Sequence, residues 1–125
     1  MIDFKNGSFI KLKKVNETNN AHLFAPLLVS GESVISEYQA IRDFVVFTNK
    51  RIITVNVQGF TGAKKDFTSL PYSKIQVFSI ETAGTFDLDS ELDITFSGLG
   101  TVRFEFNGTC DIVEIGKIIG EYVLN

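Results

Sequence analysis

Four acidic residues at alternating positions are the first candidates for chemistry in this sequence. The segment IETAGTFDLDSELDITFS, residues 80–97, contains Asp87, Asp89, Glu91 and Asp93. A calcium loop beginning at Asp87 needs glycine at its sixth position and glutamate at its twelfth, but Leu92 and Gly98 stand there. A catalytic carboxylate pair needs a cleft and unequal environments. We therefore interpret the four residues as the solvated face of a strand, with a weak surface cation site as the alternative.

The other reactive side chains form no recognisable site. His22 is the only histidine and Cys110 the only cysteine, so neither a zinc site rich in His and Cys nor an internal disulfide is expected. Cys110 precedes a predicted helix, whose N-terminus can activate a thiol, but we expect an unreactive, half-buried side chain. The sequence predicts no catalytic residue, no metal site and no cofactor, and hence a protein that is not an enzyme.

The charge of the chain argues against nucleic acid as a partner. The net charge is −3 and the pI about 5.1, whereas nucleic-acid binders carry a basic balance or stripe. The segment FIKLKKV is the best candidate for a weak anionic-surface contact, through Lys11, Lys13 and Lys14, although a strand with two alternating faces also explains it. The N-terminus lacks the apolar core of a secretory signal, so we expect a cytoplasmic protein.

The sequence pattern predicts a mainly β fold, whose strands would position these side chains. Residues 34–106 alternate short apolar runs with turn residues, which is typical of strands joined by tight turns. Apolar and polar residues alternate over 86–96, which predicts one half-buried strand. A loop at 98–100 would set Phe96 opposite Val102 on the next strand.

The segment DFVVFTNKRIITVNV predicts a hairpin that turns at Asn49 and Lys50. Phe47 then lies opposite Ile52 on one face, and the other face carries Phe44, Val46, Ile53, Val55 and Val57. Because both faces are apolar, the N-terminal segment or another subunit must cover the second one. Excess apolar surface marks an interface, and we predict one at Phe47, Ile52, Phe4 and Phe9.

The N-terminal segment is predicted to hold a short helix. The stretch NETNNAHLFAPLLVSGE offers Thr18 or Asn19 as a cap and Gly31 as an end. Pro26 should lie in the first turn or kink the helix. We divide the chain into an N-terminal arm with this helix, 1–30, and a main domain, 31–125.

The C-terminal segment CDIVEIGKIIGEYVLN predicts an amphipathic helix with a stripe of Ile112, Ile115 and Ile119. Gly108 or Thr109 could begin it. Gly116 and Gly120 lower helix propensity, and we expect them to allow close packing on a sheet.

Three blocks of the sequence resemble the bacterial pleckstrin-homology (PH) domain family. They are DFVVFTNKRII, QGFTGAKKDFTSLPYSKI and ETAGTFDLDSEL, and the resemblance covers residues 32–124. It implies a PH-like, partly open barrel of about seven antiparallel strands in two nearly orthogonal sheets, capped by the C-terminal helix.

The family resemblance also implies a function class. Members look like non-catalytic modules and some form ring-like oligomers, so a homo-oligomer or a protein partner is expected. Eukaryotic lipid-binding PH domains carry a basic cluster at the first hairpin, but QAIRDFVV offers only Arg42. A peripheral membrane-surface or small-ligand module is the alternative function.

Overall fold

The computed structural model describes residues 1–16 and 20–125. Its elements are β1 (Ser8–Val15), α1 (Ala21–Phe24), the 3-10 helix η1 (Ala25–Leu27), β2 (Val34–Gln39), β3 (Phe44–Thr48), β4 (Arg51–Gln58), β5 (Lys64–Pro71), the 3-10 helix η2 (Tyr72–Lys74), β6 (Ile75–Glu81), β7 (Ser90–Phe96), β8 (Gly100–Phe106) and α2 (Ile112–Val123). The predicted caps Thr18 and Asn19 lie outside the described residues. Pro26 stands at the start of η1, where its missing N–H removes no helical hydrogen bond.

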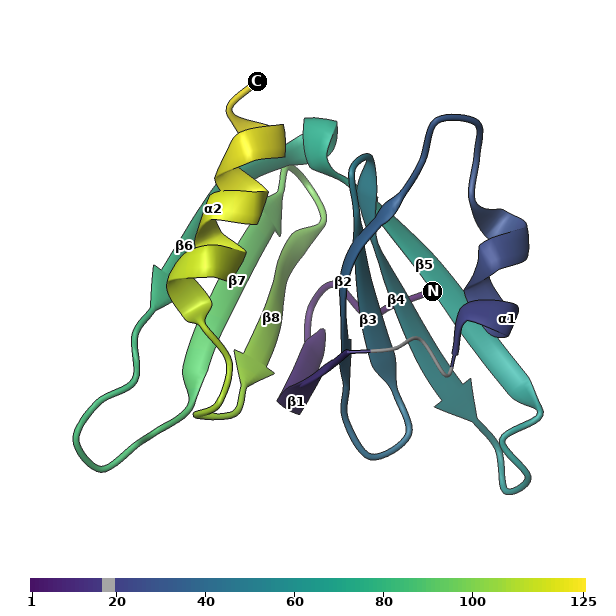
Figure 1. Ribbon diagram of the computed structural model, residues 1–125, viewed down its shortest axis with the longest axis horizontal. Coiled ribbons are helices and arrows are strands. Elements are labelled where there is room, and N and C mark those ends of the chain that lie inside the picture. Colours follow the sequence, from purple (N-terminus) through teal and green to yellow (C-terminus); the bar gives the residue numbers. More distant parts are fainter. Residues whose placement is uncertain (17–19) are drawn as a thin grey trace.

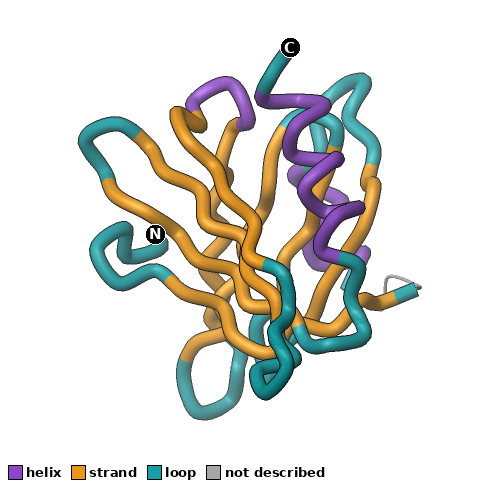
Figure 2. The backbone as a smooth tube through the Cα atoms, turned by 90° about the vertical axis from the view of Figure 1, so that its left-hand side faces the viewer, coloured by secondary structure: helices purple, strands orange, loops and turns teal. Residues whose placement is uncertain are grey.

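The eight strands form one strongly curled sheet in the order β5-β4-β3-β2-β1-β8-β7-β6. Figure 1 shows its two halves, β2–β5 on one side and β6–β8 with α2 on the other, and Figure 2 shows the curl from the α2 side. This PH-like half-barrel confirms the predicted fold class. The strand count is one higher than expected, because β1 of the N-terminal arm joins the two halves by pairing antiparallel with β2 and parallel with β8.

A bulge in β1 adapts the arm to this joining position. Phe9 and Leu12 are both buried although they are three residues apart, a spacing that strict alternation cannot place on one face. The pairing with β8 shifts between these two residues, and Lys11 between them has a positive φ of 57°. The extra residue turns Leu12 back towards the core. The predicted arm is therefore part of the barrel wall.

The β3–β4 hairpin has the predicted register. Phe44 pairs with Val55, Val46 with Ile53 and Phe47 with Ile52. The two faces contact different clusters. The concave face belongs to the main core, and the convex face forms a second cluster with the N-terminal segment, made of Phe24, Phe44, Val46, Ile53 and Val55.

The predicted strand over 86–96 begins only at Ser90. Phe86 and Leu88 are exposed in the preceding loop. The alternation of apolar and polar residues over 86–89 therefore does not correspond to a buried strand face. The predicted pairing of Phe96 with Val102 is also wrong. Phe96 pairs with Gly100, because the loop occupies 97–99, and this shift of two residues leaves every side chain on its predicted face.

Helix α2 packs its predicted isoleucine stripe into the core. Asp111 caps it by accepting hydrogen bonds from the N–H groups of Val113 and Glu114, so the helix begins later than the expected Gly108 or Thr109. A Cβ on Gly116 would lie 3.1 Å from Ile80 Cδ1, which confirms close packing on the sheet at this glycine. Of the helices in the described residues, none is long and apolar enough to cross a membrane.

Candidate interaction surfaces

Of the four residues predicted as an interface, Phe47, Ile52 and Phe9 lie inside the molecule and Phe4 is half-buried. Phe47 and Ile52 have no exposed surface and Phe9 is 3% exposed. Phe9 stacks on Phe104 with the ring centroids 5.5 Å apart, and Phe4 packs edge-on against Phe96. The predicted interface at Phe47, Ile52 and Phe9 is therefore wrong, and a contact at Phe4 stays a prediction. The curl of the sheet turns their face inward, and the N-terminal segment covers the opposite face of the hairpin.

The predicted lysine group does not form one patch. Neighbouring strand residues point to opposite faces, so Lys13 and Lys14, which pair with Gln39 and Tyr38, diverge. Lys11 lies in the bulge, and its Nζ is 3.5 Å from a carboxylate oxygen of Asp89. Its charge is thus partly neutralised within the chain. Contact of these lysines with an anionic surface stays a prediction.

The acidic residues divide between a loop and a strand. Asp87 organises the β6–β7 loop, where its Oδ1 accepts from the N–H of Asp89 at 3.1 Å. On β7, Asp93 accepts two hydrogen bonds from Arg103, at 2.9 and 3.1 Å, and Glu91 lies 3.6 Å from the same guanidinium. The hydrogen bond to Asp93 is the main cause that raises the pKa of Arg103. These side chains are partly solvated, and two of them form a surface ion-pair network.

The described residues hold no group of three or more His, Cys, Asp or Glu side chains placed to bind a metal ion. His22 is exposed on α1. Cys110 is half-buried, and its Sγ donates to the carbonyl of Leu12 over 3.6 Å.

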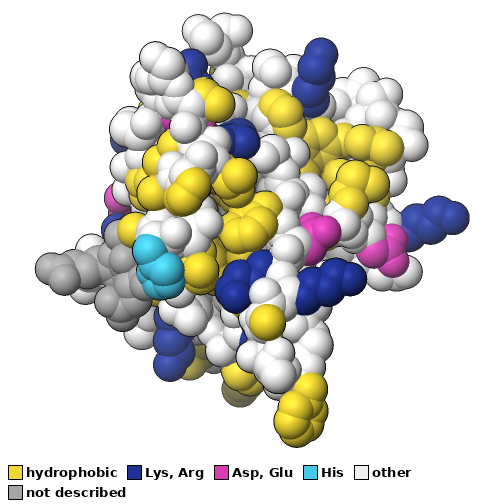
Figure 3. Space-filling model, turned by 90° about the vertical axis from the view of Figure 1, so that its right-hand side faces the viewer, with side chains coloured by type: hydrophobic (Ala, Val, Ile, Leu, Met, Phe, Trp, Pro, Cys, Tyr) yellow, Lys and Arg dark blue, Asp and Glu magenta, His cyan; other side chains and the backbone are white. Residues whose placement is uncertain are grey.

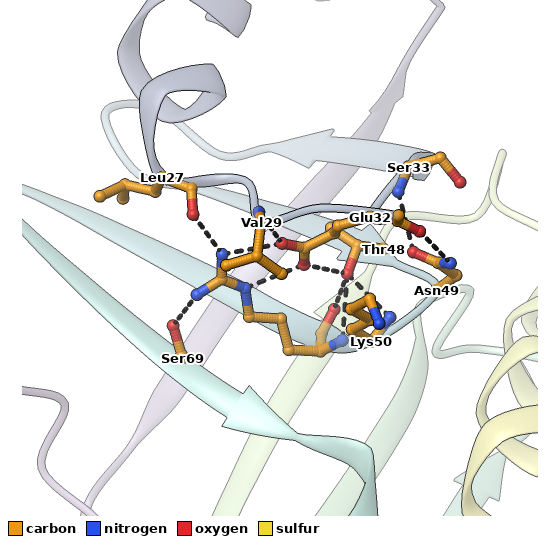
Figure 4. Close-up of polar contacts among 10 residues, drawn as sticks. Leu27, Val29, Glu32, Ser33, Thr48, Asn49, Lys50 and Ser69 are labelled. Atoms are coloured by element: carbon orange, nitrogen blue, oxygen red, sulfur yellow. Dashed lines mark hydrogen bonds and ion pairs between the residues drawn. The ribbon is translucent and has the colours of Figure 1, made fainter.

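A buried ion pair fixes the N-terminal segment to the β3–β4 turn (Figure 4). Arg51 donates to both carboxylate oxygens of Glu32 at 2.9 Å, and Thr48 Oγ1 donates at 2.7 Å. The Glu32 side chain has no exposed surface. Burial alone would raise its pKa, but the hydrogen bonds from Arg51, Thr48 and the N–H of Val29 outweigh burial and lower the pKa to about 2. Sequence reasoning missed this pair, because it joins residues distant along the chain.

The two edges of the sheet differ in their protection. Edge strand β5 begins with Lys64 and Lys65 and ends with Pro71, the residue types that natural edge strands use against pairing. The N-terminus also lies along β5. The α-amino group of Met1 forms an ion pair with Asp66, and the N–H of Ile2 donates to the Thr68 hydroxyl at 3.0 Å.

Edge strand β6, IQVFSIE, has none of these devices. Within the described chain, residues 77–81 make backbone hydrogen bonds only to β7. Val77 is 60% and Ile80 37% exposed, and the strand contains no Lys, Arg or Pro. Figure 1 shows β6 as the outermost strand of its half, with α2 packed over one face. An unpaired, apolar strand edge is a template for another strand.

A second exposed surface lies on the loops at the other end of the sheet from the C-terminus (Figure 1). The side chain of Ile41 in the β2–β3 loop is 98% exposed, and Phe60 in the β4–β5 loop is fully exposed. Arg42 ties these loops together by donating to the carbonyl of Gly59 at 2.6 Å. Figure 3 shows a hydrophobic side chain protruding at this lower end, with lysine and arginine side chains on the same face.

Comparison with known sequences agrees with this architecture. The family model described as bacterial PH domain matches residues 3–123. YjqA, an uncharacterised protein of Bacillus subtilis, is 47% identical over 97 residues, which are 76% of this chain and 78% of the relative. YozO of the same organism, also uncharacterised, is 34% identical over 109 residues, 87% of this chain and 94% of the relative.

Solved structures show the same similarity. A protein with a pleckstrin-homology domain from Shewanella loihica is 38% identical with a TM-score of 0.80, over 92% of this chain and 99% of its own. A pleckstrin-homology domain from Shewanella amazonensis is 39% identical with a TM-score of 0.68, over 89% and 90%. A PH-domain protein from Exiguobacterium sibiricum shares the fold at 18% identity, with a TM-score of 0.71 over 91% and 62%.

Proposed function

Because this chain belongs to the bacterial PH domain family, we propose that it is a non-catalytic interaction module that self-associates through the open edge of β6. The observation that carries the proposal is the contrast between the two edges. Lys64, Lys65 and Pro71 stand on β5, and the N-terminal residues contact its side chains Asp66 and Thr68, whereas β6 contains no Lys, Arg or Pro. An exposed sheet edge is a place where an extended segment can add a strand.

The energetics of strand addition suit a reversible contact. Every second residue of an edge strand points its N–H and C=O away from its neighbour, and each new hydrogen bond contributes about 1 kcal/mol net. Burying an aliphatic side chain such as Val77 adds about 1.5–3 kcal/mol when burial is complete. These terms must exceed the entropy lost on association, so we expect an assembly that forms as the concentration rises.

The test is the solution mass of wild type and two matched variants. Val77→Lys places a cation on the open edge, as natural edge strands do. Ile10→Lys makes the same kind of change on β1, a strand already paired on both sides, and the two side chains are equally exposed, at 60% and 59%. Light scattering after size-exclusion chromatography should show wild type and Ile10→Lys well above 13.9 kDa at high concentration, and Val77→Lys as a monomer. Circular dichroism controls for folding.

Two results contradict the proposal. A wild-type monomer at every concentration would exclude self-association. A Val77→Lys variant that assembles like wild type would show that β6 is not the contact.

A second candidate function, docking on a membrane surface, is favoured by the exposed loop residues Ile41 and Phe60. They protrude separately, and Arg42 bridges their loops. Fluid lipid accommodates scattered apolar side chains, and burial of each contributes about 1.5–3 kcal/mol. Each nearby basic residue adds about 1 kcal/mol with anionic lipid. The net charge of −3 opposes this contact.

Sedimentation with vesicles containing anionic lipid at low salt tests the membrane candidate. Wild type should sediment, and the double variant Ile41→Ser/Phe60→Ser should stay in the supernatant. Val113→Ser, which removes a half-exposed apolar side chain from α2, is the control and should sediment like wild type. Failure of wild type to sediment would end the membrane hypothesis.

A further inference from the structure

We propose that the groove between α2 and β2 binds a short, basic, amphipathic helix of another protein. Helix α2 packs mainly against β6, β7 and η2, and Figure 1 shows it over that half of the sheet. Its other side borders a groove of about 600 Å³, a usual size for a ligand site. No residue of β6 lines this groove, so the inference does not depend on the proposed function.

The walls of the α2–β2 groove carry apolar side chains that water still reaches. Ile35 of β2 is 40% exposed and Val113 of α2 is 55% exposed. Ile118 and Tyr122 line the same groove and are half-buried. The Tyr122 ring stacks on Tyr72 with the ring centroids 5.1 Å apart, so this part of the wall is held in place. Contiguous exposed apolar surface of this kind marks a binding site.

The groove is also acidic. Three of its lining residues carry carboxylates, Asp111, Glu114 and Glu121, and only Lys117 carries a cation. Within the described part of the chain, none of these three carboxylates forms an ion pair, whereas Glu32 and others elsewhere hold a cation. Asp111 is engaged in capping α2. Glu114 and Glu121 are therefore the carboxylates that a cationic partner would meet.

A buried tyrosine hydroxyl responds to the negative potential of this groove. Burial is the main cause that raises the pKa of Tyr38, and the charges of Glu114 and Asp111 raise it further. Lysine or arginine side chains of a partner would neutralise this potential. Positive charge is thus the electrostatic complement of the groove.

The form of the partner follows from the wall that α2 provides. A helix uses its backbone N–H and C=O groups internally, so α2 offers a partner only side chains. An extended segment would leave its own backbone groups unpaired against apolar side chains, which is costly, whereas a helix satisfies them itself. The wall from Asp111 to Tyr122 is roughly 16 Å long, at about 1.5 Å per residue, and matches about three turns of a partner helix.

This chain does not supply such a helix within its described residues. Helix α1 spans only Ala21–Phe24, and α2 carries Glu114 and Glu121 against the single cation of Lys117. The occupant is therefore a segment of a different protein. Its apolar side chains recur every three or four residues, as in other helices that bind grooves, with Lys or Arg beside them.

The test uses three labelled synthetic peptides, each about 15 residues long so that a helix can form. The first has leucine and lysine in an amphipathic helical pattern. The second has glutamate in place of every lysine, and the third has the composition of the first with a central proline that breaks the helix. In fluorescence anisotropy at low salt, the lysine peptide should bind wild type at least about tenfold more tightly than either of the others.

Variants of the protein locate the contact. Glu114→Gln/Glu121→Gln should bind the lysine peptide at least about fivefold more weakly, because two charge pairs are lost. Asp3→Asn/Asp87→Asn removes the same charge outside the groove, at carboxylates that accept backbone N–H groups as asparagine also can. This control should bind like wild type.

A second pair of variants tests the apolar wall. Ile35→Ser should weaken binding of the lysine peptide at least about threefold, because less apolar surface is buried. Ile10→Ser changes an exposed isoleucine of β1 outside the groove and should have no effect. Circular dichroism controls for folding of each variant.

The outcomes are decisive in both directions. Weaker binding by Glu114→Gln/Glu121→Gln and Ile35→Ser, with both controls unchanged, supports the inference. If all variants bind the lysine peptide equally, the peptide contacts another surface and the inference fails. If the proline peptide binds as tightly as the lysine peptide, the occupant is not a helix, and no binding of the lysine peptide also overturns the proposal. Repeating the titrations with Val77→Lys keeps the result separate from the proposed function, because the β6 edge plays no part in this contact.

Discussion

Replacing Glu32 with glutamine should remove one of the strongest local stabilising contacts in the fold. The carboxylate accepts hydrogen bonds from Arg51, from the Thr48 hydroxyl and from the N–H of Val29. Glutamine keeps the size of the side chain but loses the charge. Arg51 would then retain hydrogen bonds to the carbonyl of Leu27 and to the Ser69 hydroxyl, without its anionic partner.

The magnitude follows from the pKa of Glu32, which is about 2 in the folded protein against an ordinary value of 4.5. Since each unit of pKa difference corresponds to 1.36 kcal/mol, ionisation of Glu32 stabilises the fold by about 3 kcal/mol. A lowered pKa contributes stability above pH 4.5, and this contribution is lost as the pH falls from 4.5 towards 2. This value agrees with the loss of about 3–5 kcal/mol that commonly follows when one member of a buried ion pair is removed.

Urea unfolding at several pH values measures this effect. At pH 7 the free energy of unfolding of Glu32→Gln should be about 3 kcal/mol below wild type, and the gap should narrow as the pH falls from 4.5 towards 2. Glu91→Gln, at a partly exposed carboxylate 3.6 Å from Arg103, is the matched control and should change stability by less than about 1 kcal/mol. A Glu32→Gln variant as stable as wild type at pH 7 would refute the reasoning.

Two further substitutions should have opposite effects on stability, both measured as the free energy of unfolding. Burial raises the pKa of Glu37, although Asn20 donates to its Oε1 at 3.0 Å. Glu37→Gln should therefore stabilise the protein at pH 7, and this gain should fade as the pH falls towards 4.5. A variant less stable than wild type at pH 7 would contradict this. Gly100→Ala should destabilise by more than about 2 kcal/mol, because φ is +128° and the new Cβ would lie within contact distance of the Phe4 carbonyl. Gly98 also has a positive φ, but a Cβ added there meets no atom, so Gly98→Ala should lower the free energy of unfolding by only about 1–2 kcal/mol. Equal losses of stability in the two variants would exclude a clash between residue 100 and the Phe4 carbonyl.

Local patterns predicted those features that depend on neighbouring residues. The two-residue turn at Asn49 and Lys50 determined the β3–β4 register, because side chains alternate strictly on either side of it. The spacing of Ile112, Ile115 and Ile119 likewise predicted the buried face of α2. In both cases the relevant distances are short along the chain.

The errors arose where the pattern does not specify curvature. Both faces of the β3–β4 hairpin are apolar, and only the closed sheet shows that Phe47 and Ile52 face the main core. Phe86 and Leu88 alternate with aspartates as strand residues do, yet they are exposed in a loop. Gly84 and Ser90 on either side were the available signals for a turn.

The candidate surface at β6 could not be predicted from the sequence, because a strand becomes an edge only through the topology of the sheet. Its composition did carry a signal. Lys64, Lys65 and Pro71 protect β5, whereas β6 lacks all such residues. The spacing of Phe9 and Leu12 similarly indicated an irregular strand, and the bulge at Lys11 is its cause.

The most direct test of the account is the solution mass of wild type beside Val77→Lys and Ile10→Lys over a dilution series. The account predicts that wild type and Ile10→Lys assemble reversibly, whereas Val77→Lys stays at the 13.9 kDa of the single chain. Val77→Lys assembling as wild type does, or wild type remaining a monomer at the highest concentration, would contradict the central claim that the open edge of β6 is where this module binds.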